Sequence, residues 1–169
     1  MPSDGARGAR PPIASSGARI GNGGKGGAPI PQAKVIRDGV WVRRLTRGAH
    51  SLDPAKCGKW MWFFGDRARA EELCRRAALE GVVAECKHSD DAKGACCFYL
   101  EGDDLGAHRR AIGFFLENGM VRRTKAGRLY DIPFKYDSQT RAGQYDGAFV
   151  AQLKLHDFVD LSTGEWIAR

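Results

Sequence analysis

The sequence predicts an α+β fold: a single, largely antiparallel sheet with two helices packed on one face, preceded by a disordered N-terminal arm. Three observations support this prediction. Short apolar stretches of alternating character recur along the chain, two longer segments have helical periodicity with capping residues at their ends, and residues 1–34 have almost no bulky apolar side chain. The chain has 169 residues, of which 43% are hydrophobic, and this is enough for one buried core.

Residues 1–34 form the predicted arm. They contain eight glycines, five prolines, and five basic residues against the single acidic residue Asp4. Such a segment cannot bury enough apolar surface to offset the entropy of ordering it. Both a nucleic-acid partner bound through this arm and a solvated leader without a partner fit the composition. Residues 35–169 are then expected to form one α+β domain.

The domain is expected to begin with two strands and a helix. Val40–Leu45 alternates loosely, and Lys59–Phe64 has a stronger strand pattern. Asp66 can cap a helix from Arg67 to Leu79, with Gly81 just past its end.

Two more strands and a second helix follow. The strands are predicted at Val82–His88 and Ala95–Leu100. Asp103 or Asp104 would cap the second helix, which runs through Asn118.

The last third of the chain gives weaker patterns. A hairpin turn at 125–128 would lead into a strand at 129–136. Beyond it the sequence predicts a polar loop at 137–147, a short helix near 149–153 and a strand or turn around 158–167.

Alternation along the strands predicts which side chains share the helix-free face of the sheet. In each strand, the more apolar set belongs under the helices. The remaining sets place Lys59, Lys87, Tyr99 and Lys135, one from each of four strands, on a common face. Such a group is suited to binding an anion, although lysines on an exposed sheet face are also ordinary solvated residues.

Composition narrows the class of protein. The five cysteines form neither a C-x-x-C motif nor a Cys/His cluster, which argues against a disulfide framework and against a zinc site. They favour a reducing compartment, so we expect a cytoplasmic protein.

No apolar run approaches the roughly 18 to 20 residues that cross a bilayer, so no membrane partner is expected. The net charge of +7 favours polyanions, but more than half of this excess lies in the arm.

Four short segments together resemble a known family. They are Gly58-Lys59-Trp60, Ala84-Glu85-Cys86-Lys87, Cys97-Phe98-Tyr99, and Lys135-Tyr136-Asp137 with Thr140, Gly143 and Tyr145 after it. In this order, over about residues 57–146, the chain resembles the phosphothreonine/phosphoserine lyases of bacterial type III effectors and the lyase domains of class III and IV lanthipeptide synthetases. It is also similar to the basophilic-leukaemia-expressed proteins.

The lyase resemblance implies metal-independent β-elimination of phosphate from a phosphorylated peptide or protein, with no cofactor. It implies that Lys87 is the base, and that Lys59 and Tyr99 complete the catalytic group. The residues that it implies for phosphate binding are Lys135, Arg141 and Lys93. Crowded cations would disfavour the charged form of a lysine base and would also hold a phosphate dianion through charge-assisted hydrogen bonds.

One position departs from the lyases. They carry a general-acid histidine two residues after the first lysine, and this chain has Met61 there. Alternation places His88 on the opposite face and His108 on the core side, while His50 and His156 lie in segments that the sequence does not place. An alternative function is therefore a non-catalytic module on the same fold that binds phosphate, a nucleotide or RNA.

Overall fold

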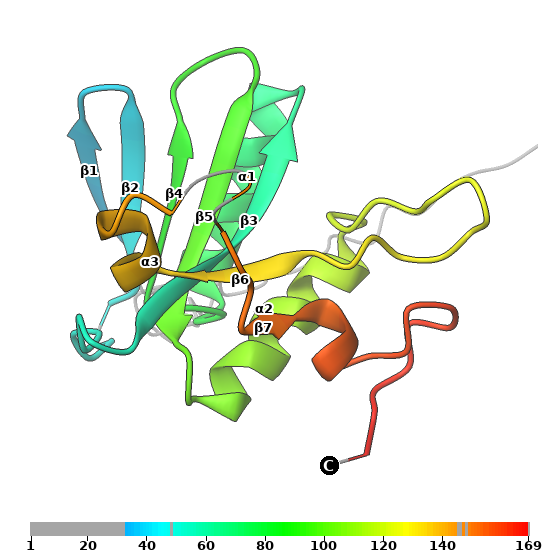
Figure 1. Ribbon diagram of the computed structural model, residues 1–169. Helices are drawn as coiled ribbons and strands as arrows, with labels where there is room; N and C mark the ends of the chain where they lie inside the picture. The colour runs from blue at the N-terminus through cyan, green and yellow to red at the C-terminus, as the bar shows by residue number, and fades with distance from the viewer. Residues whose placement is uncertain (1–32, 48, 145–146, 148, 169) are drawn as a thin grey trace, which may run out of the picture. The chain divides into compact units, whose positions relative to one another are not determined.

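Figure 1 shows the computed structural model of the chain, which describes residues 33–47, 49–144, 147 and 149–168. All of these residues belong to one unit, Pro31–Arg169. The predicted arm therefore lies outside the described residues except for its last two positions. Lys34, the last of them, already begins the first strand.

The described residues form one sheet of seven strands in the order β1-β2-β4-β5-β3-β6-β7, and every pairing in it is antiparallel. The predicted antiparallel α+β fold is thus confirmed. The strands are β1 (Lys34–Asp38), β2 (Trp41–Leu45), β3 (Cys57–Phe64), β4 (Glu85–Ser89), β5 (Gly94–Glu101), β6 (Pro133–Tyr136) and β7 (Leu153–Lys154).

Two helices confirm the predicted pair, α1 (Arg67–Leu79) and α2 (Leu105–Glu117). Asp66 caps α1 and Asp104 caps α2, because each carboxylate accepts a hydrogen bond from the backbone N–H three residues further on. These bonds satisfy donors of the first turn that have no partner within the helix. Gly81 follows α1 with φ of 67°, a left-handed conformation that favours glycine.

The main core lies between the sheet and these two helices. Trp60, Phe98 and Phe134, from three adjacent strands, are fully buried in it. Phe115 of α2 packs edge-on against Phe98, with ring centroids 4.9 Å apart. Phe63, next to the buried Phe64, is instead 64% exposed on the other face. The predicted alternation of β3 is therefore confirmed.

A hydrogen-bonded histidine links α2 to this core. The Trp60 indole N–H donates to His108 Nδ1 at 3.1 Å, and His108 Nε2 lies 3.1 Å from the Gly102 carbonyl oxygen. Since the carbonyl can only accept, the ring carries its proton on Nε2. His108 thus lies on the core side, as predicted, and both of its nitrogens are engaged.

The C-terminal third differs from the prediction in three places. The strand predicted at 129–136 begins only at Pro133, and Leu129 forms an isolated bridge with Arg123. The polar loop predicted at 137–147 instead begins with a helix, α3 (Asp137–Arg141). This five-residue helix carries no apolar stripe, so the sequence periodicity gave no sign of it.

The prediction of a short helix near 149–153 is wrong. The chain forms the two-residue strand β7 there and then a 3-10 helix at Leu155–Asp157. The bridge between Val159 and Trp166 agrees with the strand or turn predicted around 158–167.

The face of the sheet opposite α1 and α2 is partly covered. Figure 1 shows α3 in front of the sheet and α1 behind it. A small apolar cluster of Cys57, Cys97 and Tyr99 packs on this face with Leu52, which lies in the segment before β3. Within the part of the chain that the structure describes, no helix has the length and apolar character required to cross a membrane.

Candidate functional site

Strand register brings the predicted face together as two rows of side chains. One row runs across five strands and consists of Leu45, Glu85, Tyr99, Lys59 and Lys135. Directly paired residues of neighbouring strands point to the same face. Three of the four residues predicted for the anion-binding face thus lie in one row.

The second row lies two residues along each strand and therefore points the same way. It consists of Ile36, Arg43, Lys87, Cys97 and Met61. Lys87 is accordingly adjacent to the first row, on the same face as the other three predicted residues.

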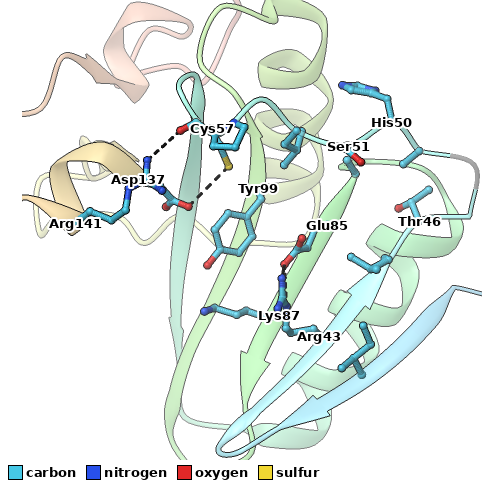
Figure 2. A pocket seen from close by; sticks show the side chains of 16 residues that line it. Arg43, Thr46, His50, Ser51, Cys57, Glu85, Lys87, Tyr99, Asp137 and Arg141 are labelled. Carbon is cyan, nitrogen blue, oxygen red and sulfur yellow. Dashed lines mark hydrogen bonds and ion pairs between the residues drawn. The ribbon is translucent and has the colours of Figure 1, made fainter.

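A pocket of about 560 Å³ opens on this face. Its floor is the sheet, and its walls are α3 and the segment that leads into β3 (Figure 2). This volume lies within the range of small-ligand sites. The polar residues that line it are Arg43, Thr46, His50, Ser51, Cys57, Glu85, Lys87, Tyr99, Asp137 and Arg141.

Two ion pairs neutralise most of the charge of the site. Arg43 donates to one carboxylate oxygen of Glu85 from both Nε and Nη2, at 3.0 and 2.5 Å. Lys59 Nζ donates to Asp137 Oδ1 at 2.6 Å and lies 3.4 Å from the Thr140 hydroxyl. Asp137 lines the pocket, whereas Lys59 is not among its lining residues.

Lys87 has a different environment. Its Nζ lies 4.1 Å from the centre of the Trp41 ring and 5.6 Å from the centre of the Tyr99 ring. Contacts of this kind stabilise an ammonium ion by attraction to the ring face. No carboxylate in the described ranges forms an ion pair with Lys87.

Arg141, in the wall of the pocket, is a second cation without a carboxylate partner among the described residues. Its Nη2 donates to the Pro54 carbonyl oxygen at 3.0 Å, which joins α3 to the segment before β3. The described carboxylates include none within ion-pair distance of its guanidinium group.

Two side chains with a titratable proton, Tyr99 and Cys57, also line the pocket. Burial raises the pKa of Tyr99 well above its ordinary value, with smaller contributions from Cys97 and Asp137. Burial, followed by the nearby Asp137 charge, raises the pKa of Cys57 to about 11. Both groups are therefore protonated at neutral pH, so Tyr99 can donate a hydrogen bond and Cys57 is a poor nucleophile.

The remaining residues predicted for the site do not line the pocket. Lys135 Nζ lies 4.9 Å from the centre of the Phe149 ring, on the far side of Lys59. Lys93 is exposed in the turn between β4 and β5, beside Gly94. Gly94 pairs with the last residue of β3, whereas the pocket lies at the first residue of that strand.

The structure also places the histidines. His88 is buried on the core side, as alternation predicted, and its Nδ1 lies 2.9 Å from the Ser89 carbonyl oxygen. His156 pairs with Asp131 at 2.8 Å, away from the pocket. His50 borders the pocket, with Nε2 3.8 Å from a Glu101 carboxylate oxygen.

Met61 packs against the Cys57, Cys97 and Tyr99 cluster. Sequence reasoning missed two other contributions to the site. Asp137 belonged to a segment noted for its resemblance but had no assigned role, and the contribution of Trp41 depends on the pairing of β2 with β4. No group of three or more His, Cys, Asp or Glu side chains that could hold a metal ion occurs among the residues described.

Comparison of the chain with protein-family models and with curated protein sequences finds no match.

Proposed function

We propose that the pocket binds the phosphate group of a phosphothreonine or phosphoserine side chain in a peptide. The observation that supports this proposal is the distribution of charge. Each of the two lining carboxylates is paired with a cation, whereas Lys87 and Arg141 have no carboxylate partner among the described residues. The pocket thus offers two positive charges to a ligand.

The chemistry of these groups suits a phosphate dianion. A guanidinium group binds phosphate through two parallel N–H donors, and an ammonium group contributes a compact charge. The hydroxyls of Tyr99 and Ser51 supply neutral donors in the same pocket, whereas the Thr46 hydroxyl already donates to the Val83 carbonyl oxygen at 2.6 Å. These groups need no metal ion to hold the phosphate.

Elimination of that phosphate is a second candidate function, favoured by the proximity of Lys87 to Tyr99. A neutral Lys87 would remove the α-proton, the Cα–Cβ double bond would form, and the Cβ–O bond would break with release of hydrogen phosphate. Two features favour binding over elimination. Lys87 Nζ lies against the Trp41 and Tyr99 rings, whose faces attract a cation, and Met61 cannot deliver a proton to the leaving phosphate.

A peptide titration followed by mass analysis tests both candidates. Three alanine-rich peptides with phosphothreonine, threonine or glutamate at the centre are titrated against the full chain, and each mixture is then analysed by mass spectrometry. We expect the phosphothreonine peptide to bind at least about tenfold more tightly than the threonine peptide, about 1.4 kcal/mol. Equal affinities would refute the proposal.

The masses separate the chemical outcomes. Binding alone leaves every peptide unchanged. A loss of about 98 Da would show elimination of phosphoric acid, and a loss of about 80 Da would show hydrolysis. An RNA oligonucleotide serves as a comparison, since tighter binding of RNA than of phosphopeptide would favour a nucleic-acid module.

A further inference from the structure

We propose that the pocket selects phosphorylated side chains that have an arginine or lysine beside them, and that Asp137 is the residue that determines this specificity. The inference rests on the proposed phosphate binding and names its ligand class more narrowly. It starts from Asp137, which lines the cavity, whereas its ion-pair partner Lys59 is not among the lining residues.

Asp137 is an anion at the wall of a site proposed to bind an anion. Its charge opposes a phosphate that approaches Lys87 and Arg141, because like charges repel across a partly exposed cavity. A ligand that carries a positive group next to its phosphate would remove this opposition. The carboxylate would then contribute to binding.

The carboxylate has the capacity to accept such a group. Its Oδ1 accepts the hydrogen bond from Lys59, and Oδ2 lies 3.8 Å from the Cys57 thiol. A thiol is a weak donor. Among the described residues, no strong donor therefore occupies Oδ2, and a guanidinium group of the ligand can donate to it.

Glu85 is less suited to this role. Arg43 donates to it twice from the neighbouring strand, and the two residues lie diagonally across paired strands of the rigid sheet. Asp137 instead begins the short helix α3, and its partner is a single lysine that donates one hydrogen bond to it. Exchange of partners is therefore easier at Asp137: the ligand cation takes the carboxylate, and Lys59 becomes available to the phosphate.

Lys59 is close enough to the proposed phosphate position to take part. Its Nζ lies 5.5 Å from the centre of the Tyr99 ring, and the Nζ of Lys87 lies 5.6 Å from the same centre. Both ammonium groups thus border one ring of the pocket floor. After the exchange, the Asp137 carboxylate is paired with the cation of the ligand, and the Lys59 ammonium group is paired with the phosphate.

The test uses two phosphothreonine peptides, one with alanine neighbours and one with arginine directly after the phosphothreonine, and the threonine form of each. Affinities are measured for the full chain and for the variants Asp137→Asn and Asp137→Glu. Glu72→Gln is the control, since Glu72 is an exposed residue of α1 paired with Arg75 on the opposite side of the sheet. We expect the wild-type chain and the control to bind the arginine phosphopeptide about tenfold more tightly than the alanine phosphopeptide.

Asp137→Asn keeps the shape of the side chain and removes its charge. We expect this variant to bind the alanine phosphopeptide more tightly than wild type does and to lose most of the preference for arginine, while Asp137→Glu keeps the preference. An unchanged preference in Asp137→Asn would overturn the inference. If this variant does not fold, Lys59→Met gives the same test in the opposite direction, because it leaves Asp137 without its internal partner and should increase the preference.

Phosphate binding and the role of Asp137 can be refuted independently of each other. Equal binding of phosphorylated and unphosphorylated peptides by the wild-type chain would refute phosphate binding. Phosphate-dependent binding without any effect of the arginine would refute only the role of Asp137.

Discussion

Replacing Lys87 by methionine removes one of the two pocket cations that have no carboxylate partner within the described part of the chain, and we expect it to weaken phosphopeptide binding by about 10- to 100-fold. A hydrogen bond to a charged group contributes about 1.5–3 kcal/mol, and each 1.4 kcal/mol corresponds to about a tenfold change in affinity. Methionine is unbranched and of similar length, so it preserves packing against the Trp41 ring, which lies 4.1 Å from the lysine Nζ.

The fold should tolerate this change. The lost cation–π attraction is about 0.5–1 kcal/mol at a partly exposed position, which lowers the melting temperature by about 2–4 °C in a domain of this size. A thermal melt of the variant therefore separates an effect on binding from an effect on folding.

Binding is measured by fluorescence anisotropy of a labelled phosphothreonine peptide at a constant ionic strength of about 0.15 M. Lys93→Met is the matched control, because it removes the same charge at the far end of the β4–β5 hairpin, and its affinity should equal that of wild type. Lys87→Arg keeps the charge and should stay within about threefold of wild type. If Lys87→Met bound as well as wild type, or if Lys93→Met lost as much affinity, the assignment of the pocket would be wrong.

Three further predictions concern packing, pH and catalysis. Gly58→Ala should destabilise the fold by about 1–3 kcal/mol, since its Cβ would lie 2.5 Å from a phenylalanine ring of β6; Gly65→Ala, with no atom within 4 Å, is the control in thermal denaturation. Burial lowers the pKa of His108, so its contribution to stability is complete above the unfolded pKa of about 6.5 and decreases as pH falls below it. The free energy of unfolding from denaturant titrations should therefore fall with pH in this range, and His108→Phe should reduce that slope. Met61→His should raise elimination of phosphate above the wild-type rate if the pocket retains a lyase base, and Lys87→Ala in that background should abolish the gain; no mass change in either variant would count against elimination.

Two physical regularities made much of the fold predictable from sequence. Helices α1 and α2 have carboxylate caps and glycine after their ends, and both signals act within a few residues of the chain. The faces of the strands follow from strict alternation, so Trp60 and Lys59 could be assigned to opposite faces without knowledge of strand order.

The pocket was less predictable, because it depends on contacts between distant segments. The resemblance implied Lys93 from its position in the chain, but Lys93 lies in the turn between β4 and β5, and Gly94 beside it pairs with the end of β3 that is far from the pocket. The α3 helix is polar, and one of the contacts that hold it is the ion pair of Asp137 with Lys59, which no local pattern reveals. The aromatic contact of Lys87 with Trp41 needs the register of β2 against β4.

The hydrogen bond between Arg141 and the Pro54 carbonyl has a consequence for the order in which the molecule folds. It joins residues 87 positions apart in the chain and connects two walls of the pocket. Closing so long a loop costs conformational entropy before the contact forms, so non-local contacts of this kind slow folding. The β4–β5 hairpin and the two capped helices rest on local contacts and carry no such cost. We therefore expect the hairpin and the two helices to form before the two walls of the pocket are joined, so that the pocket is completed late in folding.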